Sequence, residues 1–389
     1  MASGTNYYWR LAGFYFFYYA FVGMFAPYWS LYLKSLHFSA IDIGILMAAQ
    51  PVMRMIAPNL WGWLADHTGR RLLIVQLAAG LSFLFYLGVF LTTSFWGMLL
   101  VLALMNFFWS ASMPLVEATT LTWLGGRSAH YGRIRSWGSL GFIVTVVGLG
   151  YAFDYIAIAW LLWAGLVCEL GILLFSRLIP ATEAHPHHTD HQPVRQVVMQ
   201  PAVMALFGAC FLMAMAHGPY YTFYSIHLVE HGYSKGAVGA FWALGVICEI
   251  GVFFLMPRLM GYFSFGRLLQ ISLFAAVLRF LLIAWLVDAI AWVLFAQVLH
   301  ALTFGAFHAA SIGLVHEYFR GRHQARGQAL FGSLTYGAGG MLGSLTSGPV
   351  WEIWGSGVLF SLSALAAFVG ILLLRWKRPG IADPGRAVA

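Results

Sequence analysis

The sequence predicts an all-α membrane protein with twelve transmembrane helices arranged as two six-helix bundles. Three observations support this prediction: 61% hydrophobic against 9% charged residues, twelve apolar stretches, and an internal repeat that relates residues 1–180 to residues 200–378. A soluble domain contains about 25% charged residues, so this composition is typical of a chain that lies in lipid.

The twelve apolar stretches are separated by short polar breaks. Each is close to or above the roughly 20 residues that cross the hydrocarbon core of a bilayer. Because unpaired backbone groups are costly in lipid, we expect every stretch to be a helix. In chain order they lie near residues 11–33, 41–62, 72–93, 96–122, 134–153, 156–178, 201–229, 236–257, 267–287, 290–317, 327–350 and 355–374.

The repeat keeps a nearly constant offset across several helices. The segment PYWSLY that begins at Pro27 recurs 192 residues later as PYYTFY at Pro219, and Ser39 recurs 195 residues later as Ser234. Many membrane carriers place a binding site between two such halves. The sequence therefore predicts a carrier that moves a small solute across a membrane.

The predicted domains follow the repeat. An N-terminal bundle spans residues 1–180, and a C-terminal bundle with a short cytoplasmic tail spans residues 201–389. Residues 181–200 between them contain prolines and four histidines, which we interpret as a polar cytoplasmic linker. Four imidazoles could also bind a metal ion, but a solvated linker explains them as well, and no metal site or cofactor is predicted.

The basic residues indicate the orientation of the chain. Of the 21 Lys and Arg residues, 17 lie in the amino terminus, in the carboxyl tail or in the loops that follow even-numbered spans. The other four are Lys34 and Lys235, in the opposite set of loops, and Arg54 and Arg279, within spans. The positive-inside rule therefore predicts that both termini are cytoplasmic. Despite the net charge of +8, this distribution argues against nucleic acid as a partner.

Processing and disulfide signals are weak. The first apolar stretch is longer than the core of a signal peptide, so we expect it to remain as a permanent helix. The three cysteines, Cys168, Cys210 and Cys248, all fall in predicted spans, and neither a disulfide framework nor a paired metal site is expected.

The loop after the second span carries Gly62, Asp66, Gly69 and Arg70 at a characteristic spacing. Gly62 would permit close helix contact, Asp66 would accept hydrogen bonds from a neighbouring helix end or an arginine, and Gly69 would allow a tight reversal. The loop resembles the cytoplasmic signature of the major facilitator superfamily. That resemblance implies a network that closes the cytoplasmic face when the carrier opens outward.

Three further segments carry a more specific resemblance: Tyr131–Ser139 entering the fifth span, His217–Tyr221 in the seventh, and Leu299–Ala301 in the tenth. These segments resemble the 3-phenylpropionate permease family, and the resemblance extends over essentially the whole chain. The resemblance implies a multi-pass protein of the inner membrane that imports an aromatic carboxylate with a proton by alternating access. We expect a small organic acid, a proton and the lipid bilayer as partners, and function as a monomer.

Two opposite charges occupy matching positions of the repeat, Arg54 in the second span and Glu249 in the eighth. Arg54 lies about 20 Å and about 12 Å along its helix from the two ends, too deep to reach either interface comfortably. A charge at the centre of a span costs at least about 2.5 kcal/mol, so both should face protein or water. We expect Arg54 to bind the substrate carboxylate and Glu249 to bind the proton, unless they form a structural ion pair.

Glu117 in the fourth span and Arg135 in the fifth are separated by a tight hairpin and can meet. Such a pair resembles the sugar-binding pair of lactose-type proton symporters, which makes a sugar or nucleoside symporter the alternative function. Phe142 stands where that pattern would place a tryptophan, which argues against a sugar. Glu117 is a second candidate for the proton or a gate residue.

Three histidines are further candidate proton carriers because imidazole exchanges a proton near neutral pH. His217 lies beside a Gly-Pro pair in the seventh span, and His300 and His308 share a face of the tenth; each could instead be a packed core residue. Arg279 in the ninth span is the third candidate carboxylate partner, after Arg54 and Arg135. Since the ninth helix is peripheral in the superfamily, Arg279 could also pair internally.

Aromatic residues flank the prolines that the repeat relates. They would stack on a planar ligand, although an interfacial belt or core packing explains them too. These candidate substrate contacts are Tyr28, Trp29, Tyr220, Tyr221 and Tyr224.

An enzyme is not expected. An intramembrane acyltransferase or protease would use His300 or His308, and neither a Cys or Asp partner nor a His-rich ligand triplet lies at helical spacing from them. A sensor that does not transport is a remaining alternative, although no soluble output domain is apparent.

Overall fold

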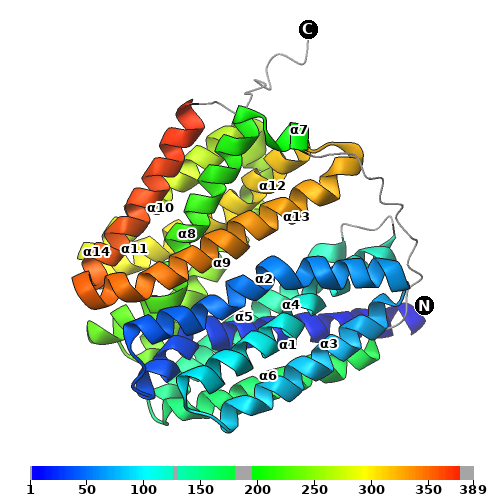
Figure 1. Cartoon of the computed structure of the whole chain (residues 1–389), viewed down its shortest axis with the longest axis horizontal. Coiled ribbons are helices and arrows are strands. Elements are labelled where there is room, and N and C mark those ends of the chain that lie inside the picture. The colour runs from blue at the N-terminus through cyan, green and yellow to red at the C-terminus, as the bar shows by residue number, and fades with distance from the viewer. Residues whose placement is uncertain (1, 126–129, 180–194, 377–389) are drawn as a thin grey trace. The chain divides into compact units, whose positions relative to one another are not determined.

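The computed structural model describes residues 2–125, 130–179 and 195–376. All regular elements in these ranges are helices (Figure 1). The His-rich part of the expected linker and the carboxyl tail lie outside the described residues.

The first half contains six long helices. Ser39 caps the second of them, because its Oγ accepts from the backbone N–H of Asp42 and the Asp42 carboxylate accepts in return. In chain order the elements are α1 (Ala2–Ser35), α2 (Ala40–Thr68), α3 (Arg71–Tyr86), η1 (Leu87–Phe90), α4 (Phe95–Leu124), α5 (Tyr131–Phe153), η3 (Ile158–Trp160) and α6 (Leu161–Leu178).

The second half repeats this pattern with interruptions. Two of its elements, η4 and η6, are π-helical. In chain order the elements are α7 (Arg195–Val198), α8 (Pro201–Glu230), α9 (Lys235–Tyr262), α10 (Phe265–Trp285), α11 (Ile290–His300), η4 (Ala301–Ala306), α12 (Phe307–Tyr318), η5 (Gly321–His323), α13 (Gln324–Gly332), η6 (Ser333–Gly339) and α14 (Gly340–Trp376).

Among the described residues, eleven continuous helical segments are long and apolar enough to cross a membrane. The last, Arg326–Trp376, has 51 residues and would measure about 76 Å, more than twice the roughly 30 Å hydrocarbon core. Gly355 interrupts it with φ 80° and ψ 178°, a conformation outside the helical region. The segment therefore supplies two spans, and the expected twelve-helix fold is confirmed.

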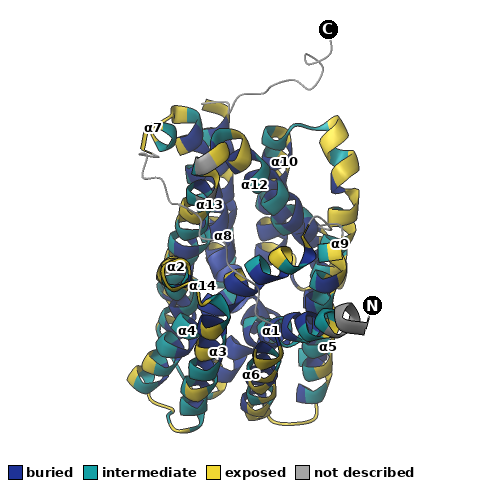
Figure 2. Cartoon of the chain, turned by 90° about the vertical axis from the view of Figure 1, so that its right-hand side faces the viewer, coloured by how far each residue is buried: buried dark blue, intermediate teal, exposed yellow. Residues whose placement is uncertain are grey.

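The chain forms two compact units, Met1–Thr189 with Tyr233–Ala240, and Asp190–Gly232 with Phe241–Ala389. In the first unit α1 packs against α5 and α6, and α4 packs against α2 and α3. In the second, α14 packs against α8 and α10, and α8 is buried along most of its length (Figure 2).

Large apolar side chains are exposed on both units. Examples are Trp96 at 76% and Phe254 at 81% exposure. An apolar surface of this extent is unusual for a protein in water and fits one that contacts lipid.

Candidate functional site

Arg54 lies over an aromatic platform in the first unit. Its side chain is exposed, and its guanidinium carbon is 5.7 Å from the centroid of the Trp109 ring. Trp109 is buried and stacks on Tyr18 with the two centroids 4.2 Å apart. Among the residues that the structure describes, no carboxylate lies within 4.0 Å of the Arg54 guanidinium.

Glu117 and Arg135 each contact a tyrosine. The Arg135 guanidinium donates to the Tyr19 hydroxyl and lies 3.9 Å over the same ring. The Glu117 carboxylate accepts from the Tyr131 hydroxyl at 3.0 Å. Within the described ranges the two charges form no ion pair of 4.0 Å or less, so the hairpin brings them to neighbouring rings but not into direct contact.

Arg279 is the centre of a buried polar cluster in the second unit. The side chain has no exposed surface. Its Nε donates to the Ala296 carbonyl at 3.1 Å, and its Nη1 donates to Thr303 Oγ1 at 3.2 Å and to His217 Nε2 at 3.3 Å. This one side chain therefore connects α10 to α8, α11 and η4.

An aromatic face lies under the Arg279 guanidinium. The guanidinium carbon is 4.1 Å from the centroid of Tyr220, which stacks on Tyr224 at 4.7 Å and contacts Trp242 at 4.8 Å. The Tyr220 hydroxyl donates to Gln297 Oε1 at 3.2 Å, and Gln297 Nε2 donates to the Tyr224 hydroxyl. Two of the predicted aromatic contacts thus belong to a hydrogen-bonded network inside the second unit.

The hydrogen bonds of His217 determine its tautomer. Its Nδ1 lies 2.8 Å from the Met213 carbonyl, which only accepts, so Nδ1 carries the hydrogen. Nε2 is therefore the acceptor for Arg279. Both ring nitrogens of His217 are therefore engaged in hydrogen bonds. A proton added to Nε2 would turn it into a donor that faces the N–H donor of Arg279.

The other two candidate histidines differ from His217. The Nδ1 atom of His300 is buried and has no hydrogen-bond partner within the described ranges, and its ring lies 5.9 Å from the Tyr220 ring. His308 is half-buried, and its Nδ1 is 3.0 Å from the Tyr336 hydroxyl in η6. Of the three histidines, His300 is thus the one whose Nδ1 can form a new hydrogen bond without breaking a described one.

Glu249 is half-buried on α9 and faces the π-helical segment η4. A Cβ added to Gly305 in η4 would lie 3.1 Å from the Glu249 Cγ, so the glycine allows this close approach. The leading candidate proton carrier therefore lies beside the segment that follows His300.

The remaining aromatic candidates occupy different environments. Tyr28 and Trp29 are fully buried in the first unit, where the Tyr28 hydroxyl donates to the Val146 carbonyl at 2.6 Å. Tyr221 is half-buried, with its ring centroid 5.4 Å from that of Tyr220. In this structure Tyr28 and Trp29 pack in the interior of their unit.

The signature loop forms its expected reversal. Gly69 follows α2 with φ +65°, and its N–H donates to the Ala65 carbonyl at 3.0 Å. Asp66 and Arg70 are exposed, and among the described residues the Asp66 carboxylate makes no hydrogen bond. A Cβ on Gly62 would meet nothing within 4 Å, so no neighbouring helix contacts it closely here.

Sequence reasoning missed Gln297 and Thr303, which flank His300 by three residues on either side. That i±3 spacing places them near one face of a helix, and this was the available signal. It also left Glu169 unassigned. The structure buries Glu169 completely, with Oε1 accepting from Ser82 Oγ at 3.2 Å and Oε2 without a partner in the described chain.

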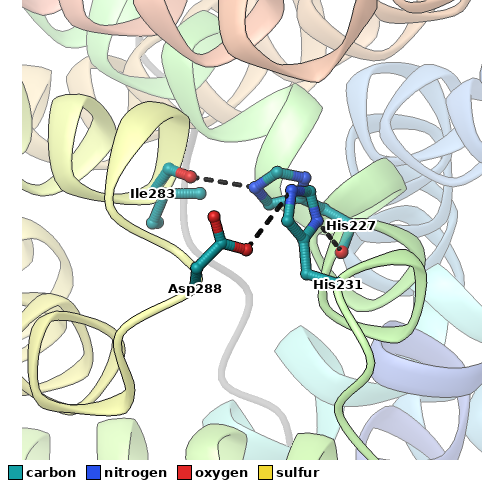
Figure 3. Close-up of polar contacts among 4 residues, drawn as sticks. All are labelled: His227, His231, Ile283 and Asp288. Carbon is teal, nitrogen blue, oxygen red and sulfur yellow. Dashed lines mark hydrogen bonds and ion pairs between the residues drawn. The ribbon is translucent and has the colours of Figure 1, made fainter.

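A second histidine cluster lies at the end of α8 (Figure 3). His227 Nε2 donates to the Ile283 carbonyl at 2.9 Å, and His231 Nδ1 donates to the His227 carbonyl at 2.8 Å. His231 Nε2 is 4.0 Å from the exposed carboxylate of Asp288. No group of three or more His, Cys, Asp or Glu side chains in the described ranges could hold a metal ion.

Comparison with known proteins identifies the family. A sequence model of a protein family, described as "MFS_1 like family", matches residues 8–362 of this chain. The chain belongs to the MFS_1 like family. It is therefore a multi-pass membrane protein and a secondary transporter of the major facilitator type, not an enzyme, and the resemblance predicted from the sequence is confirmed.

Curated relatives match nearly the whole chain. The chain is 28% identical over 356 residues to a probable 3-phenylpropionic acid transporter of Escherichia coli (strain K12), covering 90% of this chain and 93% of that protein. It is 26% identical over 367 residues to a maltose permease of Geobacillus stearothermophilus, covering 93% and 92%.

Solved structures support the fold. A point mutant of the nucleoside transporter NupG aligns with a TM-score of 0.86 over 95% of this chain and 99% of its own, at 16% identity. The human organic anion transporter MFSD10 aligns with a TM-score of 0.66 over 95% and 99%, also at 16% identity.

Proposed function

We propose that this transporter imports a small aromatic carboxylate together with a proton by alternating access. One observation supports this most directly. Arg54, Arg135 and Arg279 each rest on an aromatic ring, and none has a carboxylate within 4.0 Å among the described residues. Arginine stays charged in proteins, and a charge within a span is costly without a counter-charge. An aromatic acid supplies a carboxylate for the guanidinium and a ring for the aromatic face.

Arg54 is the first candidate for the carboxylate because it is the only exposed one of the three. Glu249 is the leading proton carrier, followed by Glu117 and the histidines. Substrate binding and protonation of Glu249 are coupled in this proposal, so each binding event changes the affinity for the other. We place the protein in the inner membrane as a monomer with both termini in the cytoplasm.

Uptake into proteoliposomes under an imposed pH gradient tests this function. We expect accumulation of 3-phenylpropionate but not of its neutral amide, and loss of accumulation in Arg54→Gln. Glu249→Gln should abolish gradient-driven accumulation and retain counterflow exchange. Equal uptake of acid and amide, or unchanged accumulation in both variants, would contradict the proposal.

A sugar or nucleoside symporter is the second candidate. Glu117 and Arg135 lie beside tyrosine rings, a combination of charge and aromatic surface that also suits a polar ring with hydroxyl groups. The maltose permease and nucleoside transporter relatives favour it as well. In that case Arg54→Gln retains uptake of a neutral sugar or nucleoside, whereas Glu117→Gln and Arg135→Gln lose it.

A further inference from the structure

We propose that the Arg279 cluster of the second unit is a binding site for one monovalent anion, either the carboxylate of the transported acid or a free halide. The carboxylate version rests on the proposed function but assigns the substrate's charged end to Arg279 instead of Arg54, the first candidate named above. The halide version is independent of it.

The cluster contains an uncompensated positive charge. Arg279 has no exposed surface, and its described hydrogen bonds all go to neutral groups: a carbonyl, a hydroxyl and the acceptor nitrogen of His217. A buried charge without a partner is strongly destabilising, whereas an anion that neutralises it in a region of low dielectric binds strongly. Because Arg279 is the one permanent cation of this cluster, a single negative charge is the matching ligand.

Two buried nitrogen atoms in the cluster have no hydrogen-bond partner among the residues that the structure describes. They are Arg279 Nη2 and His300 Nδ1. Both side chains lie against Tyr220, the guanidinium carbon at 4.1 Å and the His300 ring at 5.9 Å from its centroid. In the tautomer with hydrogen on Nδ1, His300 can donate as well, so each of the two side chains has a hydrogen-bond donor left for an anion.

The backbone approaches the cluster closely on two elements, α9 and η4. A Cβ added to Gly245 on α9 would lie 3.2 Å from both Gln297 Oε1 and His300 Cδ2, so α9 closes that side of the cluster. The π-helical segment η4 begins directly after His300, and π segments inside helices frequently mark functional sites.

A purely structural role for Arg279 makes a different prediction. Arg279 connects four elements and would stabilise the unit through those bonds alone. Its removal would then lower the melting temperature equally in every buffer. An anion site makes the melting temperature depend on the anion, and that dependence disappears when the charge is removed.

The test measures the thermal stability of the full-length protein in nanodiscs at fixed pH and ionic strength. Chloride is titrated against gluconate, and 3-phenylpropionate is titrated against its neutral amide. The variants are Arg279→Gln, Arg279→Lys, and Arg279→Met, which is used if the Arg279→Gln protein misfolds. The matched control is Arg258→Gln, which removes an exposed arginine from the same unit.

We expect wild type and Arg258→Gln to be stabilised by chloride, by 3-phenylpropionate or by both, and Arg279→Gln and Arg279→Met to lose that stabilisation. Arg279→Lys should bind at least about tenfold more weakly because an ammonium lacks the planar fork. Loss of the chloride response alone assigns a free ion; loss of the 3-phenylpropionate response assigns the substrate carboxylate.

An anion-independent melting temperature in wild type, or an anion response that survives in Arg279→Gln, overturns the inference. Uptake assays on the same preparations separate this result from the proposed function. Proton-coupled uptake of the acid by Arg279→Gln with wild-type affinity leaves the function intact and removes the carboxylate version of the site; the chloride response then decides the halide version. A chloride response that requires Arg279 in a protein that transports no acid leaves the site intact.

Discussion

The two halves share a repeat but differ in what they bury. In the first unit α4 and α5 run as uninterrupted α-helices, and the carboxyl group of Glu169 is fully buried and accepts one hydrogen bond from Ser82. In the second unit the corresponding helices contain the π segments η4 and η6, and the fully buried charge is Arg279. Asn106 in the first half occupies the repeat position of His300 in the second.

This difference indicates a division of roles on one scaffold. The first unit presents guanidinium groups at aromatic rings, of which Arg54 is exposed. The second unit gathers Glu249, His300 and Arg279 around a helix that departs from regular α geometry. The first unit therefore contains two of the three candidate arginines, and the second contains the leading candidate proton carrier beside a buried arginine cluster.

The largest expected effect follows from breaking the network of the second unit. Gln297→Leu removes the acceptor of the Tyr220 hydroxyl and a donor to the Tyr224 hydroxyl. We expect a loss of about 2–3 kcal/mol in unfolding free energy because buried polar groups lose partners. Thermal and denaturant unfolding measure it, and Gln76→Leu, at a half-buried glutamine of the first unit, is the matched control. Equal losses in both variants would remove the contrast between the units.

The next largest loss of unfolding free energy is expected from Gly245→Ala. The added methyl group would lie 3.2 Å from Gln297 Oε1 and from His300 Cδ2. We expect destabilisation of about 1–2 kcal/mol from overpacking and weaker binding of the anion. Gly251→Ala on the same helix meets nothing within 4 Å and should be neutral or slightly stabilising. A stabilised Gly245→Ala would show that α9 does not enclose the cluster.

Glu169→Gln tests whether the buried charge of the first unit has a structural role only. Glutamine retains an oxygen that accepts from Ser82 Oγ, so we expect a change of less than about 1 kcal/mol and unchanged uptake. Loss of pH-driven accumulation with intact counterflow would instead make Glu169 a proton carrier. That result would give the first unit the role assigned here to the second.

The smallest effect on the unfolding free energy is expected at the exposed edge of the second histidine cluster, shown in Figure 3. Asp288 is 84% exposed and lies 4.0 Å from His231. Asp288→Asn should change the unfolding free energy by less than about 0.5 kcal/mol at pH 6 or 8, because exposed ion pairs contribute little. A larger loss would show that the contact between Asp288 and His231 stabilises this end of α8.

The sequence predicted the spans, the family and the reversal at Gly69, because hydropathy and glycine spacing are local signals. It did not predict that His217 would be held by Arg279, 62 residues away, or that Gln297 would connect Tyr220 to Tyr224. These contacts depend on how three helices rotate against one another. Glu117 and Arg135 show the same limit, because the hairpin allowed a direct pair but each of them hydrogen-bonds to a different tyrosine.

The central claim is that an organic acid and a proton cross together. Proteoliposomes that contain a pH-sensitive dye test it most directly, by reporting internal acidification when substrate is added outside. The account predicts acidification with 3-phenylpropionate, none with its amide, and none from Glu249→Gln. Acidification driven by maltose or a nucleoside but not by the acid would contradict it.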